Sequence, residues 1–102
     1  MDATPDGEGG LQARRREAVL RAFFDSQGRL TTIPARHAKR LVVLDQLVQR
    51  FEPGERYSEF EVNNRLRPAH DDVAALRRYL VDEGFLSREG GVYWRSGGSV
   101  AD

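Results

Sequence analysis

The most regular pattern of apolar residues in the chain lies between residues 35 and 51, ARHAKRLVVLDQLVQRF. Its apolar positions recur three and four residues apart, which is the spacing of one face of a helix. That face consists of Leu41, Leu44, Leu47, Val48 and Phe51. The sequence EPGE follows, so we predict a helix over residues 35–51. A weaker stripe of the same spacing predicts an earlier helix at residues 13–24.

A capping box predicts where the next helix begins. Ser58 is followed three residues later by Glu61, and Tyr57 and Val62 stand at the positions of a hydrophobic staple. The helix must end before Pro68, which cannot continue it. We therefore predict a helix of two to three turns that starts at Ser58.

The last part of the chain changes from helical spacing to alternation. A helix predicted at residues 69–83 is followed by FLSRE and VYWR, which flank a Gly-Gly turn and predict a β-hairpin over residues 85–95. Residues 55–57 can add a third strand to support so short a hairpin. This order predicts a mainly α fold with a small β-hairpin (α+β). We interpret it as a winged helix-turn-helix with the helix at residues 13–24 as an extra element.

Length and composition indicate one domain. The chain has 102 residues, of which 39% are hydrophobic and 31% charged, and no cysteine. We assign residues 11–96 to a single winged-helix domain and expect disordered tails at the Gly-rich, polar residues 1–10 and 97–102. The acidic start does not resemble a signal peptide, and no apolar run reaches the length of a membrane span. We expect a cytoplasmic protein that does not bind membranes.

The charges cancel over the whole chain but are unevenly placed. There are 16 basic and 16 acidic residues, and all the basic ones lie between Arg14 and Arg95. The first turns of the helix at 35–51 carry Arg36, Lys39 and Arg40, where cations oppose the helix dipole. Either an anion meets these cations, or nearby acids and solvent compensate them.

The helix at residues 69–83 is the candidate for reading DNA. It would enter the major groove, with small Ala74 permitting close approach and the arginines reaching base edges or phosphates. The candidate DNA-binding residues are Arg65, Arg67, Ala74, Arg77, Arg78, Arg88 and Arg95. Asp71, Asp72 and Asp82 share or border the same face and would repel phosphates. The alternative is a solvated face of mutually compensating charges.

Other residues that often carry chemistry have structural interpretations here. The chain has no phosphate-binding Gly loop, nucleophile elbow or zinc-protease motif, so we expect neither catalysis nor a cofactor. We expect no metal site, because His70 and the two aspartates that follow it diverge around a helix. His37 is expected to be half-buried in register with Leu41, and Trp94, rather than Tyr93, to close the core.

Residues 23–95 closely resemble an uncharacterised bacterial domain family, one of the numbered domains of unknown function. The resemblance rests on the motifs GRL…P, FxPGxxYSExEVN, HDDxAxLRRYLV and the final YWR. Members of that family occur alone or fused behind an ArsR-type repressor domain. The resemblance therefore implies a connection with transcription regulation, and it assigns no functional residue.

Two interpretations of function follow. The first is a small winged-helix regulator that binds double-stranded DNA, alone or as a homodimer. The second is a winged-helix module for protein interaction or ligand sensing that does not bind DNA itself. A continuous surface of the candidate arginines would favour the first. An exposed apolar patch around Phe60, Tyr93 and Trp94 would favour the second.

Overall fold

The computed structural model describes residues 7–100 of the chain. Within this range the protein is α+β, as predicted, with four helices and one small three-stranded antiparallel sheet. The helices are α1 (Gly7–Phe23), α2 (His37–Val48), α3 (Glu59–Leu66) and α4 (Val73–Asp82), and the strands are β1 (Arg56–Ser58), β2 (Leu86–Glu89) and β3 (Val92–Arg95). None of these helices is both long and apolar enough to cross a membrane.

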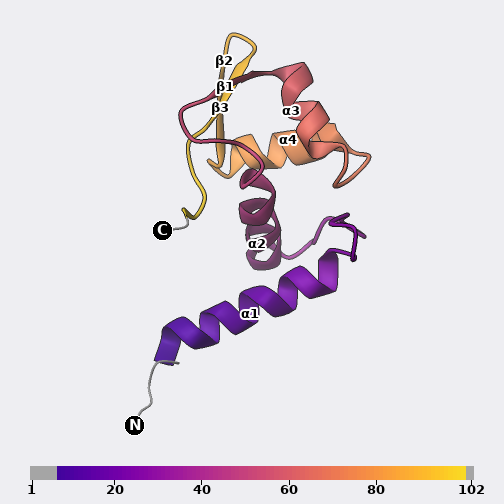
Figure 1. Cartoon of the computed structure of the whole chain (residues 1–102), viewed down its shortest axis with the longest axis vertical. Helices are drawn as coiled ribbons and strands as arrows, with labels where there is room; N and C mark the ends of the chain where they lie inside the picture. Colours follow the sequence, from indigo (N-terminus) through magenta and orange to yellow (C-terminus); the bar gives the residue numbers. More distant parts are fainter. Residues whose placement is uncertain (1–6, 101–102) are drawn as a thin grey trace.

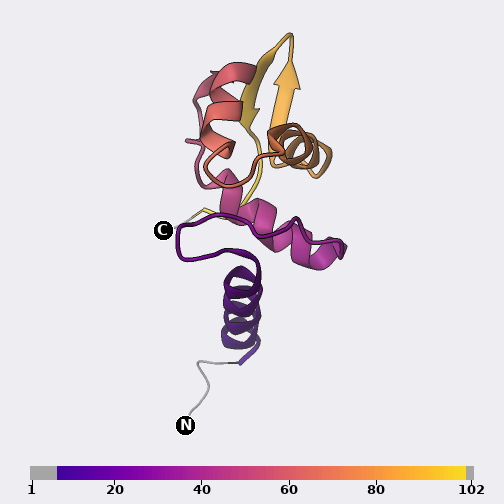
Figure 2. The same ribbon diagram turned by 90° about the vertical axis from the view of Figure 1, so that its right-hand side faces the viewer.

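The elements are stacked along the long axis of the molecule (Figure 1). Helix α1 lies at one end and packs against α2, while α3, α4 and the sheet lie together at the other end. A view from the side shows the same separation (Figure 2). Helix α2 therefore stands between α1 and the rest of the protein.

The apolar face of α2 forms the centre of the core. Four of its five predicted members are fully buried and Leu41 is half-buried. They pack with buried residues of the other elements: Val62, Leu66, Leu76, Leu80, Leu86 and Tyr93. The helix itself is shorter than predicted. The backbone of Arg36 is extended, and residues 49–51 form a turn after the helix. Helix α2 therefore covers His37–Val48 rather than 35–51.

The capping box at the start of α3 is confirmed. The Ser58 hydroxyl accepts a hydrogen bond from the Glu61 amide at 3.1 Å, and the Ser58 amide donates to Oε1 of Glu61 at 2.8 Å. Two amides that a helix start leaves unpaired are thereby satisfied. The cap is local in sequence, which is why the spacing alone identified it.

Helix α4 begins later than predicted. Residues 69–72 form a turn, and the carboxylate of Asp72 accepts a hydrogen bond from the Ala75 amide at 3.1 Å. Asp72 is thus the N-cap of α4 and not part of its first turn. Gly84, with a φ of 81°, follows the end of the helix in the left-handed conformation that glycine adopts without strain.

The sheet has the order β1-β3-β2, with both pairs antiparallel. The third strand predicted at residues 55–57 is confirmed as β1, and it places Tyr57 opposite Tyr93. Both tyrosines are buried, whereas Trp94 is only half-buried. The expectation that Trp94 closes the core is therefore wrong. The register with β1 puts Tyr93 on the inner face and Trp94 on the other.

The described chain begins and ends within the two segments expected as tails. Helix α1 begins at Gly7, inside the segment 1–10, and Gly98 and Ser99 lie against α2. Gly98 permits this approach, because a Cβ atom there would stand 2.5 Å from a methyl group of Val48. Residues 1–6 and 101–102 lie outside the described part.

Asp45 connects three segments that are far apart in the sequence. Its Oδ1 accepts the Ser99 amide at 2.6 Å, and its Oδ2 accepts the Ser99 hydroxyl at 2.7 Å. The guanidinium of Arg16 in α1 lies 2.8 Å from Oδ2. Burial raises the pKa of Asp45, but the hydrogen bonds from Ser99 and the charge of Arg16 outweigh it, so the pKa lies below its ordinary value.

The substitution Asp45→Asn tests this connection. A lowered pKa means that folding favours the ionised carboxylate, so its stabilisation is present near pH 7 and lost as the pH falls. We expect the variant to lose about 1–3 kcal/mol of unfolding free energy at pH 7, because asparagine keeps only one acceptor oxygen and lacks the charge that pairs with Arg16. The difference should shrink as the pH falls below about 4, the ordinary pKa of an aspartate, and should vanish only below the lowered pKa of Asp45 in the folded protein.

Urea denaturation at a series of pH values measures both effects. Asp82→Asn is the matched control, because Asp82 is exposed and should change stability by less than about 0.5 kcal/mol. Equal losses in the two variants at pH 7 would contradict the structural role of Asp45.

Candidate nucleic-acid interface

Helix α4 presents a distinct outer face. Leu76 and Leu80 are fully buried on the inner side, and Ala74, Arg78 and Asp82 are exposed on the outer side. This division follows from the helical spacing of the apolar residues. Ala74, Arg78 and Asp82 therefore lie on the side of α4 that faces solvent.

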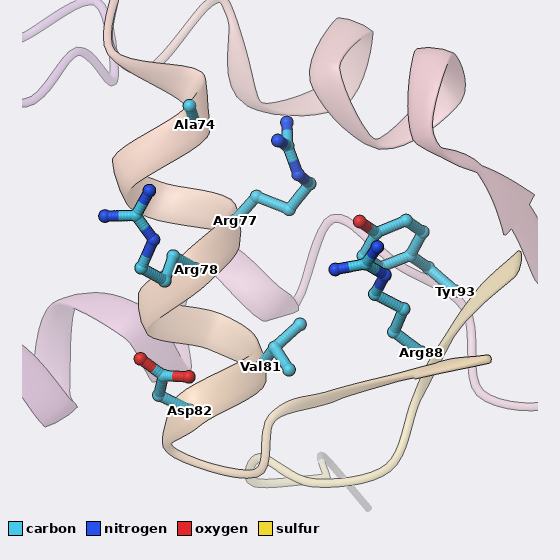
Figure 3. Close-up of a pocket in the computed structure, with 7 residues that line it drawn as sticks. All are labelled: Ala74, Arg77, Arg78, Val81, Asp82, Arg88 and Tyr93. Atoms are coloured by element: carbon cyan, nitrogen blue, oxygen red, sulfur yellow. The ribbon is translucent and has the colours of Figure 1, made fainter. Parts of the chain in front are cut away.

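A cavity of about 210 Å³ lies between α4 and the β-hairpin (Figure 3). Four of the seven candidate DNA-binding residues line it together: Ala74, Arg77, Arg78 and Arg88. Val81, Asp82 and Tyr93 complete its walls. Residues that stand up to nineteen positions apart in the sequence thus share one surface, with α4 on one side and the hairpin on the other.

Arg77 is held in place by α3. Its Nη1 donates to Oδ1 of Asn63 at 2.5 Å, and its Nη2 lies 3.9 Å from a carboxylate oxygen of Glu59. Glu59 in turn accepts a hydrogen bond from the Tyr93 hydroxyl at 3.1 Å. Only 20% of the Arg77 side chain is exposed. Arg77 therefore links α3 and α4 and presents only part of its guanidinium to the cavity.

Arg78 and Arg88 are the freer cations of this surface. Both side chains are exposed. Arg88 extends from β2 over the ring of Tyr93, with its guanidinium carbon 5.9 Å from the ring centre (Figure 3). Among residues 7–100, neither arginine forms a hydrogen bond or ion pair with an acidic side chain.

Two of the three acids expected to repel an anion are already engaged. The carboxylate of Asp71 lies 2.7 Å from Nη2 of Arg29, and the hydrogen bond and charge of Arg29 lower the pKa of Asp71. Asp72 is the N-cap of α4. Only Asp82 remains beside the cavity without an ion pair among the described residues.

The other candidate arginines lie away from the cavity. Arg95 donates to three backbone carbonyls, those of Phe51, Gly97 and Ser99. Its guanidinium thus joins the end of β3 to the turn that follows α2 and to the segment after β3. The structure places Arg95 in this internal role rather than at the outer edge of the hairpin.

Arg65 and Arg67 lie on and just after α3. Arg65 donates from Nη1 to the carbonyl of Arg50 at 2.9 Å and stacks on the ring of Tyr57. Arg67 is exposed and donates to the side chain of Asn64 at 3.2 Å. Arg67 is thus accessible, whereas Arg65 is bound to the body of the protein.

The two histidines are held by different contacts. No group of three or more histidine, cysteine, aspartate or glutamate side chains in the described part could hold a metal ion. His37 is 60% exposed, so the expectation of a half-buried histidine is wrong; its Nε2 lies 3.1 Å from Oε1 of Glu83. His70 accepts a hydrogen bond at Nδ1 from the amide of Asp72 at 3.0 Å.

Three side chains shape the surface through contacts that the sequence did not predict: Arg29, Glu59 and Asn63. Glu59 and Asn63 are four residues apart, which places them on the same face of a helix. That spacing could have grouped them, but it could not show that this face meets Arg77. Arg29 lies in a loop, and no local pattern connects it with Asp71.

The comparisons with known proteins identify a family. Residues 29–95 match the family described as an uncharacterised protein conserved in bacteria, DUF2087, and the chain belongs to this family. The match covers α2, α3, α4 and the sheet and leaves out α1. Comparison with curated proteins and with solved structures gives no match.

The substitution Asn63→Ala tests how Arg77 is positioned. We expect it to destabilise the protein by about 0.5–1.5 kcal/mol, because Arg77 loses its hydrogen-bond acceptor between α3 and α4. Asn64→Ala is the matched control, since Asn64 pairs only with the exposed Arg67. Chemical denaturation measures both variants. A larger loss for Asn64→Ala would show that the Asn63–Arg77 contact is not the one that joins the helices.

Proposed function

We propose that this member of the DUF2087 family is a winged helix-turn-helix protein that binds double-stranded DNA in transcription regulation. The order of elements from α2 to β3 supports this fold, with α3 and α4 as the helix-turn-helix and the β2–β3 hairpin as the wing. The sheet order β1-β3-β2 supports it too, because β1 joins the hairpin through its second strand.

The observation that carries the proposal is the convergence of arginines on one open surface. Arg78 and Arg88 face the cavity between α4 and the hairpin, and Ala74 leaves space above the helix. Arginine suits this role because its planar guanidinium donates two hydrogen bonds to one phosphate or to one guanine edge. The engagement of Asp71 and Asp72 elsewhere weakens the electrostatic objection to a nucleic-acid partner.

The resemblance to a family that also occurs fused to ArsR-type repressors is a second reason for placing the protein in transcription regulation. On this proposal the protein acts in the cytoplasm, without catalysis and without a cofactor. Arg67 would contact the DNA backbone beside α4, whereas Arg65 and Arg95 would support the fold.

The second interpretation is a module for protein interaction or ligand sensing that does not bind DNA, and one side chain favours a protein partner. Phe60 in α3 is 72% exposed, and an exposed aromatic ring is a typical anchor for a protein partner. The apolar patch that would favour this interpretation is limited to Phe60, because Tyr93 is buried and Trp94 is covered in part by Arg56, whose guanidinium lies 5.0 Å from the indole ring centre.

The DNA proposal is tested by fluorescence anisotropy with a labelled random-sequence duplex at several salt concentrations. We expect binding that weakens linearly on logarithmic axes as salt rises. The double substitution Arg78→Ala/Arg88→Ala should reduce the slope by about 2, since each lost phosphate contact contributes about 0.9. Arg21→Ala, an exposed arginine of α1, is the control and should leave the slope unchanged. Absence of binding at low salt would overturn the proposal.

Substitution of Asp82 provides a test in which DNA binding should become tighter rather than weaker. If phosphates approach the cavity, Asp82→Asn removes a repulsive charge from its wall. We expect the variant to bind duplex DNA more tightly by up to about fivefold, which corresponds to about 1 kcal/mol for two unit charges near each other in water. The same titration measures this gain. Unchanged or weaker binding would show that DNA does not contact this end of α4.

A further inference from the structure

A second hollow lies at the opposite end of the molecule from the cavity of α4. It is a groove of about 490 Å³ between α1 and α2. Its apolar part consists of Val19 from α1 and of Ala38 and Val42 from α2. Val19 and Val42 are only half-buried, so a part of their apolar surface still faces solvent.

The same groove carries three cations, and two of them have no partner within residues 7–100. The guanidinium of Arg16 is engaged by Asp45 and by the side chain of Gln46. Arg15 and Lys39 are exposed, and among residues 7–100 neither forms a hydrogen bond or ion pair. No carboxylate of the described side chains belongs to the lining of the groove. An apolar surface is thus bordered by positive charge that nothing in the described part neutralises.

We propose that this groove binds a small apolar molecule that carries a carboxylate or a similar anionic group. The apolar part of the ligand would cover Val19, Ala38 and Val42, and its charge would be met by Arg15 and Lys39. The volume lies within the range of about 300–1,000 Å³ that is typical of small-molecule sites. This site is separate from the surface proposed for DNA and does not depend on that proposal.

Charge also argues against a second copy of the chain as the occupant. Helix α1 contains four arginines and two glutamates. An α1 helix from another copy would therefore add cations to a groove that already holds three. Like charges in contact across an interface are unfavourable, whereas an anionic ligand would compensate the existing ones.

The proposal is tested with the full chain and the probe 8-anilinonaphthalene-1-sulfonate, an aromatic sulfonate whose fluorescence rises in apolar surroundings. We expect saturable binding and displacement by 1-naphthoate. The matched cation 1-naphthylmethylammonium has a ring of the same size and should not displace the probe. Chemical-shift changes on 1-naphthoate binding should include the methyl groups of Val19 and Val42.

Charge reversal then tests the role of the cations. Arg15→Glu and Lys39→Glu should each weaken 1-naphthoate binding by about fivefold or more, as expected for a lost and reversed surface charge. Arg21→Glu makes the same change in α1 outside the groove and should leave the affinity unchanged. Thermal denaturation of each variant identifies any loss that comes from unfolding.

Three results would overturn the proposal. They are equal displacement by the two naphthalene derivatives, affinity unchanged in both groove variants, or a dimer in which the Val19 and Val42 methyl groups are protected from solvent. The last result would assign the groove to a second copy. None of them bears on duplex binding, so the failure of this site and the failure of the DNA proposal are distinguishable.

Discussion

Burial of one face of α2 is the constraint on which the rest of the structure depends. Leu44, Leu47 and Val48 lose all contact with solvent, and Phe51 continues the same face beyond the end of the helix. The ring of Phe51 meets Tyr57 of β1 edge to face, at 5.2 Å between ring centres. Because α3, α4 and the sheet close over this face, α2 fixes the distance and angle at which α4 stands before the hairpin. The opposite side of the same helix receives α1.

The parts of the fold that depend on local chemistry could be predicted from the sequence. The cap at Ser58, the Gly-Gly turn of the hairpin and the apolar spacing of α2 each follow from residues a few positions apart. The sequence predicted the ends of α2 and α4 less accurately. At α4, Asp72 acts as the cap rather than as a first-turn acid, and either role satisfies the same sequence pattern. The choice of Tyr93 over Trp94 for the core depends on strand register, which the alternation of one strand leaves open.

The sequence indicated which helix carries the candidate site, but not which of the candidate arginines line it. The arginines differ in which hydrogen-bond acceptors surround them. Arg95 donates to backbone carbonyls and becomes part of the framework, whereas Arg78 and Arg88 have no hydrogen-bond acceptor among the described residues and remain available. Such differences depend on contacts between residues more than forty positions apart, as with Arg95 and Phe51. A zero net charge thus coexists with an arginine-rich surface, because most carboxylates near it are committed to caps and ion pairs.

The close contact of Gly98 with Val48 determines where the end of the described chain emerges. Ser99 is fixed beside Asp45 and near Arg16, on the side of α2 that faces α1. A fluorophore attached at Val100, the last described residue and an exposed one, would therefore start beside α2 and away from Arg78 and Arg88. A label at this position leaves the outer face of α4 unobstructed.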